Sequence, residues 1–220
     1  MTKLYFIRHG KTEWNLSGRY QGANGDSPLL PSSYEEIERL ADYLRDVPFV
    51  HAYASPIKRA RVTAMRLLQG LKQHPDLTLA SGLQEFNLGK MEGMTFTDVK
   101  EQFPKAYDGF RYHADQYDPA EINGESFADV IARMTPIIRQ AAAVHPRETD
   151  NLLFVSHGAA LNVGINGLLN VPLDEMRAKG GLANTSTTIL ETTDGGQSFT
   201  LIDRNITSYL NEQASATNTI

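Results

Sequence analysis

Five side chains have the chemical types needed for phosphoryl transfer, although they lie far apart in the sequence. Arg8 and His9 follow a short apolar run, and His157 follows another one near residue 155. Arg59 and Glu85 come after two further runs. A guanidinium binds phosphate oxygens through paired charge-assisted hydrogen bonds. A neutral histidine can attack phosphorus, and a carboxyl group can protonate a leaving oxygen and then deprotonate water. Together these residues favour chemistry on a phosphoryl group.

The elements that must position these residues form an alternating pattern. Short apolar runs predict strands over 3–7, 49–54, 77–80 and 152–156. Helical spacing of apolar residues predicts helices over 37–44, 60–71, 97–103, 127–138 and 159–169, and residues 185–203 predict a hairpin. This alternation predicts an α/β three-layer sandwich, with a mostly parallel sheet flanked by helices. The carboxyl ends of parallel strands share one edge, so the five side chains can converge there.

Taken singly, each of these residues has an ordinary structural explanation. A lone histidine at a strand end usually makes a structural hydrogen bond, and a lone Glu85 would be a solvated carboxylate. Arg59, on the first turn of a helix, opposes the helix dipole, and a bound anion would offset that cost. Ser55 and Pro56 are predicted as the N-cap and first residue of that helix. The coincidence of all five groups at strand ends is what favours a site.

Composition excludes several other classes of protein. The 220 residues include no cysteine, which rules out a disulfide framework, thiolate catalysis and a cysteine-ligated metal. A net charge of −5 argues against nucleic-acid and anionic membrane partners. The first apolar run has five residues, too few for a signal segment or a membrane span. We therefore expect a cytoplasmic protein, either a monomer or a homodimer.

The chain is predicted to form a single domain over 1–220, with one insertion. Residues 86–125 are rich in glycine, aspartate and aromatic residues and are predicted to form a small cap. Four aromatic side chains of this segment would line a substrate pocket or, as is more common, hold the cap together: Tyr107, Phe110, Tyr112 and Tyr117. Residues 211–220 have few groups to bury and are predicted to be a flexible tail.

Six motifs in this order resemble those of the histidine phosphatase superfamily, also called phosphoglycerate mutase-like. The resemblance covers residues 4 to about 210. Its motifs are RHGKTEWN (8–15), RYQGANGDSPL (19–29), SPIKRARVTA (55–64), LQEFNLGKMEG (83–93), NGES (123–126) and FVSHG (154–158). Arg-His-Gly alone is a weak signal, whereas the ordered set is specific.

The resemblance implies a role for each matching residue. His9 would be the nucleophile that becomes phosphorylated, and Glu85 would be the general acid and then the general base. The phosphate pocket would be formed by Arg8, Arg59 and His157. The substrate-binding residues would be Asn15, Gln21, Gly22 and Gly158. Neither a metal nor a bound cofactor is implied, and the partner would be a small phosphorylated metabolite.

The acceptor of the phosphoryl group separates two activities, because water gives a phosphatase and a second substrate hydroxyl gives a mutase. Residues 86–125 contain four Lys and Arg against eight Asp and Glu. Such a cap is poorly suited to a second phosphate, so the sequence favours a phosphatase acting on small phosphomonoesters. A cofactor-dependent phosphoglycerate mutase is the alternative. A non-catalytic phosphate-binding protein on the same fold is disfavoured because His9, Glu85 and His157 are all present.

Overall fold

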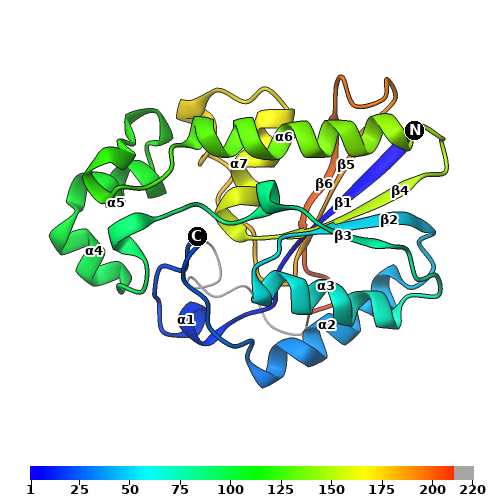
Figure 1. The fold of residues 1–220 in the computed structure, drawn as a ribbon, viewed down its shortest axis with the longest axis horizontal. Coiled ribbons are helices and arrows are strands. Elements are labelled where there is room, and N and C mark those ends of the chain that lie inside the picture. Colours follow the sequence, from blue (N-terminus) through cyan, green and yellow to red (C-terminus); the bar gives the residue numbers. More distant parts are fainter. Residues whose placement is uncertain (211–220) are drawn as a thin grey trace.

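The computed structural model describes residues 1–210, and the predicted tail at 211–220 lies outside them. One six-stranded sheet has the order β3-β2-β4-β1-β5-β6 (Figure 1). Its strands are β1 (Thr2–Arg8), β2 (Phe49–Ala54), β3 (Leu77–Leu79), β4 (Asn151–Ser156), β5 (Thr187–Thr192) and β6 (Thr200–Ile206). Strands β1, β2, β3 and β4 are parallel to one another, whereas β5 and β6 add an antiparallel edge. The predicted mostly parallel sheet and hairpin are confirmed.

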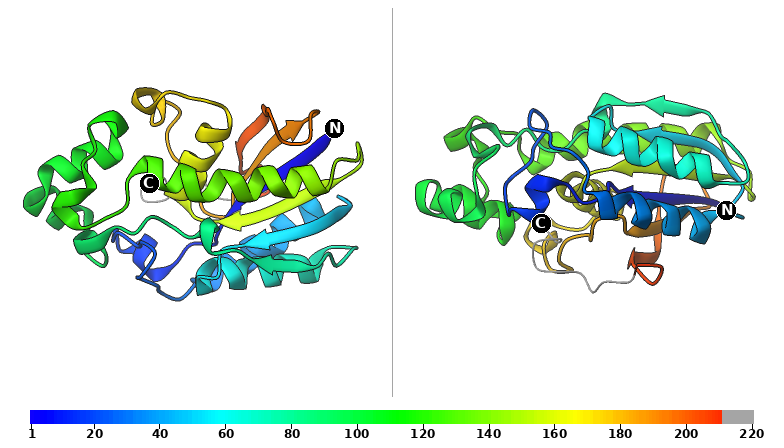
Figure 2. Two further views of the ribbon diagram at one scale, coloured as in Figure 1. Left: turned by 45° about the horizontal axis from the view of Figure 1, so that its top comes forward. Right: turned by 90° about the horizontal axis from the view of Figure 1, so that it is seen from below.

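Helices cover both faces of this sheet (Figures 1 and 2). Helices α2 (Pro31–Leu44) and α3 (Lys58–Gly70) lie on one face, and α6 (Phe127–Val144) and α7 (Gly158–Leu168) lie on the other. Alternate strand residues enter the two cores because successive side chains of a strand point to opposite faces. Ile7 and Val155 pack with the α2–α3 core, whereas Phe6 and Phe154 pack with the α6–α7 core. The three-layer α/β prediction is therefore confirmed.

Residues 86–125, here called the cap segment, lie beyond the carboxyl ends of the parallel strands (Figure 1). The sequence predicted one helix over 97–103, and the structure has two, α4 (Phe96–Gln102) and α5 (Pro104–Arg111). Pro104 cannot continue α4, but its fixed φ suits the first position of α5. Short 3-10 helices complete the segment: η2 (Gly89–Met91), η3 (Ala114–Gln116) and η4 (Pro119–Ile122).

The remaining short helices lie in loops around the same strand ends. They are α1 (Glu13–Leu16), η1 (Ser81–Leu83) and η5 (Leu173–Glu175). Thr12 caps α1 through a capping box with Asn15, whose side chain is buried. The loop after β1, the loop after β3 and the cap segment therefore surround one edge of the sheet.

Candidate active site

Three strands deliver polar residues to one point at the carboxyl edge of the sheet. Arg8 at the end of β1 is paired in register with Ser156 at the end of β4. The His9 backbone N–H donates to the Ser156 carbonyl (3.0 Å), and the Ser55 N–H donates to the Val155 carbonyl (3.0 Å). These bonds extend the sheet by one residue past β1 and β2. His9 and His157 are thus brought together, with ring centroids 5.2 Å apart.

His9 is held as a neutral imidazole, with a proton on Nδ1 and an electron pair on Nε2. Its Nδ1 lies 2.7 Å from the Gly10 carbonyl, which can only accept, so Nδ1 carries the proton. Its Nε2 accepts from Arg59 Nε at 3.2 Å. Burial, and then the charges of Arg59 and Arg8, hold the pKa of His9 well below its usual value. The neutral form with an electron pair on Nε2 is the form that can attack phosphorus.

His157 is oriented by Ser55, which does not act as predicted. Helix α3 begins at Lys58 with Ile57 at the N-cap, so Ser55 and Pro56 lie before the helix. The Ser55 hydroxyl instead lies 2.8 Å from His157 Nε2. Burial, and then the charge of Arg59, lower the pKa of His157 and favour the neutral ring. Ser55 Oγ already accepts from the Ile57 N–H (3.3 Å), and its O–H is used when His157 accepts at Nε2 and carries its proton on Nδ1, which is buried and unpartnered among the described residues. Nδ1–H is available to a phosphoryl oxygen.

Arg8 lies flat against the start of α7 because residue 158 has no side chain. A Cβ on Gly158 would lie 2.9 Å from both Cζ and Nε of Arg8. Arg8 Nη1 donates to the Leu182 carbonyl. Burial lowers the pKa of Arg8 to about 10, while Glu85 partly offsets that effect, so the guanidinium remains charged near neutral pH. Gly158 is therefore required by a close approach.

Arg59 is fully buried and ties His9 to the loop over residues 21–26. Its Nη2 donates to the Gly22 carbonyl (3.0 Å), and its Nη1 donates to the Gly25 carbonyl (2.8 Å) and to Asp26 Oδ1 (3.2 Å). It stands on the first turn of α3, as predicted. Arg8 and Arg59 bring two guanidinium groups to His9, and the Arg59 charge is paired with the Asp26 carboxylate.

Glu85 is bound by the first turn of α7. Its Oε1 accepts from the Ala160 N–H (2.7 Å) and the Phe86 N–H (3.0 Å), and its Oε2 accepts from the Ala159 N–H (3.1 Å). A helix N-terminus offers such unpaired N–H groups to an anion. Although Glu85 follows no regular strand directly, η1 turns the chain so that the carboxylate enters the pocket. The predicted convergence of Glu85 with both histidines is present in the structure.

Asn15, Gln21 and Gly158 line the same pocket as Arg8, His9 and Glu85, whereas Gly22 does not. Asn15 Oδ1 accepts from the Thr12 N–H (3.1 Å), so its amide donors are left for the pocket. Gln21 is held by Thr12 and Ser27. Gly22 packs closely against the Glu92 side chain, and a Cβ there would collide with the Glu92 carboxylate. The structure thus brings eight of the nine predicted residues to the pocket wall or into direct contact with His9.

The family model for the histidine phosphatase superfamily (branch 1) matches residues 4–205. The chain belongs to this superfamily. A Saccharomyces cerevisiae broad-specificity phosphatase is 32% identical, over 73% of this chain and 67% of its own length. A Caenorhabditis elegans 6-phosphofructo-2-kinase/fructose-2,6-bisphosphatase is 32% identical over 79% of this chain, which spans 35% of that longer protein.

Solved structures give the same assignment for the fold. The Bacillus stearothermophilus protein YhfR superposes with a TM-score of 0.86 and 30% identity, covering 95% of this chain and 99% of its own. Curated relatives of the superfamily include both phosphatases and phosphoglycerate mutases. The chain therefore has the histidine phosphatase fold and belongs to a superfamily of enzymes, while the comparisons do not select one reaction.

Three pocket-lining residues of this superfamily member were not predicted from the sequence. They are Tyr20, Leu88 and Ala159. Of the four cap aromatics, Phe110 lines the pocket, Tyr117 is buried beside it, and Tyr112 is exposed. Phe110 also packs against Phe86 at 5.2 Å between ring centroids, so it both lines the pocket and holds the cap segment together. Tyr20 lies in one of the quoted motifs, but nothing in its spacing indicated that it would face the cap.

A second group of missed residues supports the site from behind. Arg133 on α6 donates to the carbonyls of Gly82, Gln84 and Glu85, so it clamps the segment that carries the carboxylate. Asn184 Nδ2 donates to the His9 carbonyl (3.0 Å). Within residues 1–210, no helix is long and apolar enough to cross a membrane. In the same residues, no group of three or more His, Asp or Glu side chains could hold a metal ion.

Proposed function

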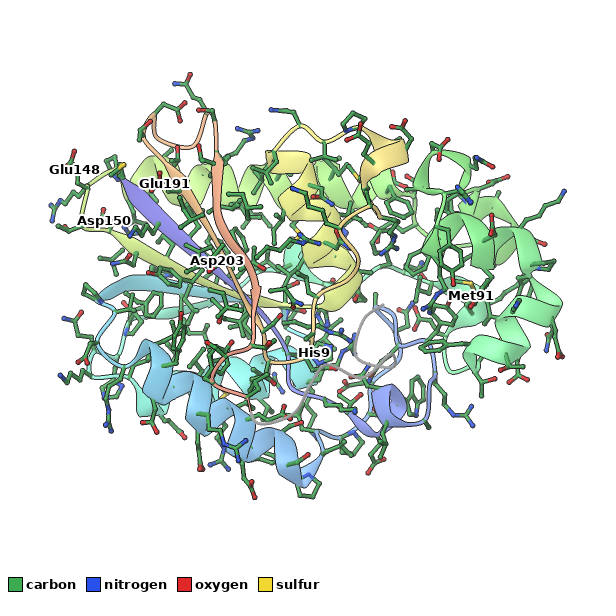
Figure 3. The ribbon with its side chains drawn as sticks, turned by 180° about the vertical axis from the view of Figure 1, so that it is seen from behind. His9, Met91, Glu148, Asp150, Glu191 and Asp203 are labelled. Atoms are coloured by element: carbon green, nitrogen blue, oxygen red, sulfur yellow. The ribbon has the colours of Figure 1, made fainter. Side chains whose placement is uncertain are left out.

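We propose that this protein hydrolyses small phosphomonoesters through a phosphohistidine formed on Nε2 of His9. The observation that carries the proposal is the state of the His9 ring, with Nδ1–H fixed by the Gly10 carbonyl and the Nε2 electron pair directed at the Arg59 guanidinium. In Figure 3, His9 lies at the end of β1, on the side of the sheet that faces the cap segment and its labelled Met91. The labelled Glu148, Asp150 and Glu191 lie at the opposite end of the sheet.

The first step breaks the bond between phosphorus and the substrate oxygen. His9 Nε2 forms the new bond to phosphorus. The Arg59 Nε–H, which donates to Nε2 in the free enzyme, donates instead to a phosphoryl oxygen, a stronger acceptor, and Arg59 keeps its proton. Arg8, Arg59 and His157 Nδ1–H bind the equatorial oxygens on which charge is spread in the transition state. Protonated Glu85 gives its proton to the leaving alcohol.

The second step returns His9 to its starting state. Glu85, now a carboxylate held by the first turn of α7, takes a proton from water. The water oxygen bonds to phosphorus, the bond between phosphorus and Nε2 breaks, and inorganic phosphate leaves. The proton that Glu85 receives restores its acid form for the next cycle.

Hydrolysis is favoured over phosphoglycerate mutation by the charges of the cap segment. Its eight carboxylates are all at least partly exposed, and three of its four cations, Lys90, Lys100 and Lys105, are exposed as well. Arg111 is half-buried and lies over aromatic rings of the cap. A bisphosphoglycerate carries a second dianionic end, and this segment offers that end one inward cation. Water is the acceptor that the pocket accommodates without such a clamp.

Two assays on the same enzyme preparation test the proposal. The first measures phosphate release from a panel of metabolite phosphomonoesters and, separately, isomerisation of 3-phosphoglycerate with 2,3-bisphosphoglycerate added. The second mixes the enzyme with a substrate that carries radioactive phosphorus, quenches the reaction, and looks for an acid-labile, alkali-stable label on the protein. We expect release to exceed isomerisation, and we expect label on wild type and on the matched control His74→Ala but not on His9→Ala.

Two outcomes contradict the proposal in different ways. Isomerisation faster than phosphate release would make the protein a mutase with the same nucleophile. Absence of both turnover and label with every substrate would make it a phosphate-binding protein on an enzymatic fold.

A further inference from the structure

Three buried polar atoms near the cap side of the pocket have no hydrogen-bond partner among residues 1–210: Tyr117 Oη, and Nε and Nη2 of Arg177. Together with Tyr20 and Arg111, whose side chains are hydrogen-bonded to each other, these residues are here called the cap-side cluster. The four residues come from three parts of the chain: the loop before α2, the cap segment with Arg111 and Tyr117, and the loop after η5. Buried unpartnered donors cost free energy, so native structures keep few of them without a reason.

One member of this cluster lines the pocket, and the others are linked to it through the ring of Phe110 or through Tyr20. Tyr20 and Phe110 line the pocket that contains His9. The Arg177 guanidinium lies over the Phe110 ring, 4.9 Å from its centroid, and over the Phe127 ring at 5.2 Å. Phe110 also contacts Tyr20 and Tyr117 at 6.1 and 5.5 Å between ring centroids. A substrate whose phosphoryl group meets His9 can therefore extend toward Tyr20 and Phe110, with Arg177 stacked on Phe110.

The free atoms of Arg177 match the shape of an oxyanion. Nε and Nη2 form one edge of the guanidinium, and their N–H bonds point in parallel, which suits two oxygens of a carboxylate. Burial lowers the pKa of Arg177 to about 10, so the side chain is still a cation near neutral pH. The phenol hydroxyls of Tyr20 and Tyr117 add two more donors beside it. Every free group of the cluster can donate, and none is anionic.

We infer that the cap-side cluster is a subsite for a carboxylate carried by the substrate, with Arg177 as its main ligand. This inference rests on the proposed function and names its substrate class as phosphomonoesters of small carboxylic acids. A single carboxylate fits better than a second phosphate, because Arg177 offers one edge with two unpartnered nitrogens. Three acidic residues of the cap segment have partners of their own. Glu125 is paired with Arg133 at 2.6 Å, and Asp98 and Asp118 cap helices.

A matched pair of substrates tests the subsite in the wild-type enzyme without any substitution. 3-Phosphoglycerate and glycerol 3-phosphate differ in that a carboxylate of the first is a hydroxymethyl group in the second. We expect kcat/KM for 3-phosphoglycerate hydrolysis to be about 10- to 100-fold higher, the usual contribution of hydrogen bonds to a charged group. Equal values for the two substrates would overturn the subsite and leave the proposed function standing. Release of phosphate from neither substrate nor any other phosphomonoester would remove both.

Arg177→Met then identifies the residue responsible, since methionine keeps an apolar contact with Phe110 and removes the donors. The ratio of the two kcat/KM values should fall toward one, mainly through KM for 3-phosphoglycerate. Arg66→Met is the matched control, because Arg66 also stacks on a ring, that of Tyr34, but lies exposed and away from the pocket. Its ratio should equal that of wild type.

Two further results decide between this subsite and other roles of Arg177. An equal loss of kcat for both substrates in Arg177→Met would mean that Arg177 acts on Glu85, and it would overturn the subsite. A wild-type preference for fructose 1,6-bisphosphate over fructose 6-phosphate larger than the preference for the carboxylate would also overturn it, in favour of a second phosphate. If Arg177→Met fails to fold, Arg177→Lys, which keeps the charge but loses the paired edge, should lower the ratio by a smaller factor.

Discussion

The sheet edge and the cap side of the pocket differ in how their polar atoms are satisfied. At the sheet edge, His9 has a partner on each nitrogen and Glu85 accepts three backbone N–H groups, while His157 keeps Nδ1 for the phosphoryl group. On the cap side, Arg177 and Tyr117 keep buried donors unpartnered among residues 1–210. Regular structure supplies the first set, because strand ends and a helix N-terminus present backbone groups at fixed positions. Loops supply the second set, and its missing partners are those that a substrate can bring. The protein itself therefore holds most of the groups that carry the reaction, whereas the groups near the rest of the substrate are left open.

The largest expected effect comes from Glu85→Gln, which changes the sheet edge alone. Without a proton to give the leaving alcohol, kcat for an alkyl phosphate should fall by about 100- to 10,000-fold. The loss should be smaller with p-nitrophenyl phosphate, because nitrophenolate leaves without protonation. Competitive inhibition by inorganic phosphate, which reports Arg8 and Arg59, should change little.

Glu121→Gln is the matched control for this substitution, since Glu121 is an exposed carboxylate of the cap segment. Its turnover should match wild type. Unchanged turnover in Glu85→Gln would show that the carboxylate at the sheet edge takes no part in proton transfer, and the contrast between the two halves of the site would lose its main support.

A pH series measures what the sheet edge contributes to stability. The pKa values of His9 and His157 are lowered in the fold, first by burial and then by Arg59. Below the unfolded value near 6.5, the unfolded chain binds more protons than the native one, so stability is lost as pH falls from 6.5 toward the folded pKa values. The free energy of unfolding should fall with decreasing pH by up to about 1.4 kcal/mol per pH unit for each histidine. Urea unfolding between pH 5 and 7.5 measures this slope.

His157→Gln should make that slope shallower by the share of one histidine, whereas His74→Gln, which removes an exposed histidine, should keep it. The same slope in His157→Gln and wild type would mean that His157 does not resist protonation in the native site.

The smallest expected effect compares one buried hydroxyl from each half. The Ser156 hydroxyl donates to the Leu83 carbonyl at 2.6 Å, whereas the Tyr117 hydroxyl has no partner in the described chain. Ser156→Ala should lower the free energy of unfolding by about 1–3 kcal/mol, because it leaves a buried carbonyl unpaired. Tyr117→Phe removes an unpaired group and should change that free energy by less than about 0.5 kcal/mol, or raise it. A larger loss in Tyr117→Phe than in Ser156→Ala would contradict the contrast between the two halves.

Much of the sheet edge could be predicted because its geometry follows from local patterns. Apolar runs and helical spacing locate the strands and helices, and parallel strands must bring their carboxyl ends to one edge. His9 and His157 therefore converge, although they are far apart in the sequence. Ser55 shows the limit of such patterns, since Ser-Pro before a helix is typical of an N-cap. The Ser55 hydroxyl orients His157 instead of capping α3, because β4 places the His157 ring beside it.

The sequence by itself determined the fold class, the superfamily and the residues that can carry the reaction, because each depends on residue type, spacing and chain order. Only the tertiary structure decided which proton His9 carries, which backbone groups hold Glu85 and where the charges of the cap segment face. It also decided that Arg177, in a loop with no periodic pattern, lies beside Phe110 and Tyr20. Long-range packing places the Arg177 guanidinium on the Phe110 ring. No local propensity encodes a contact between residues so far apart in the sequence.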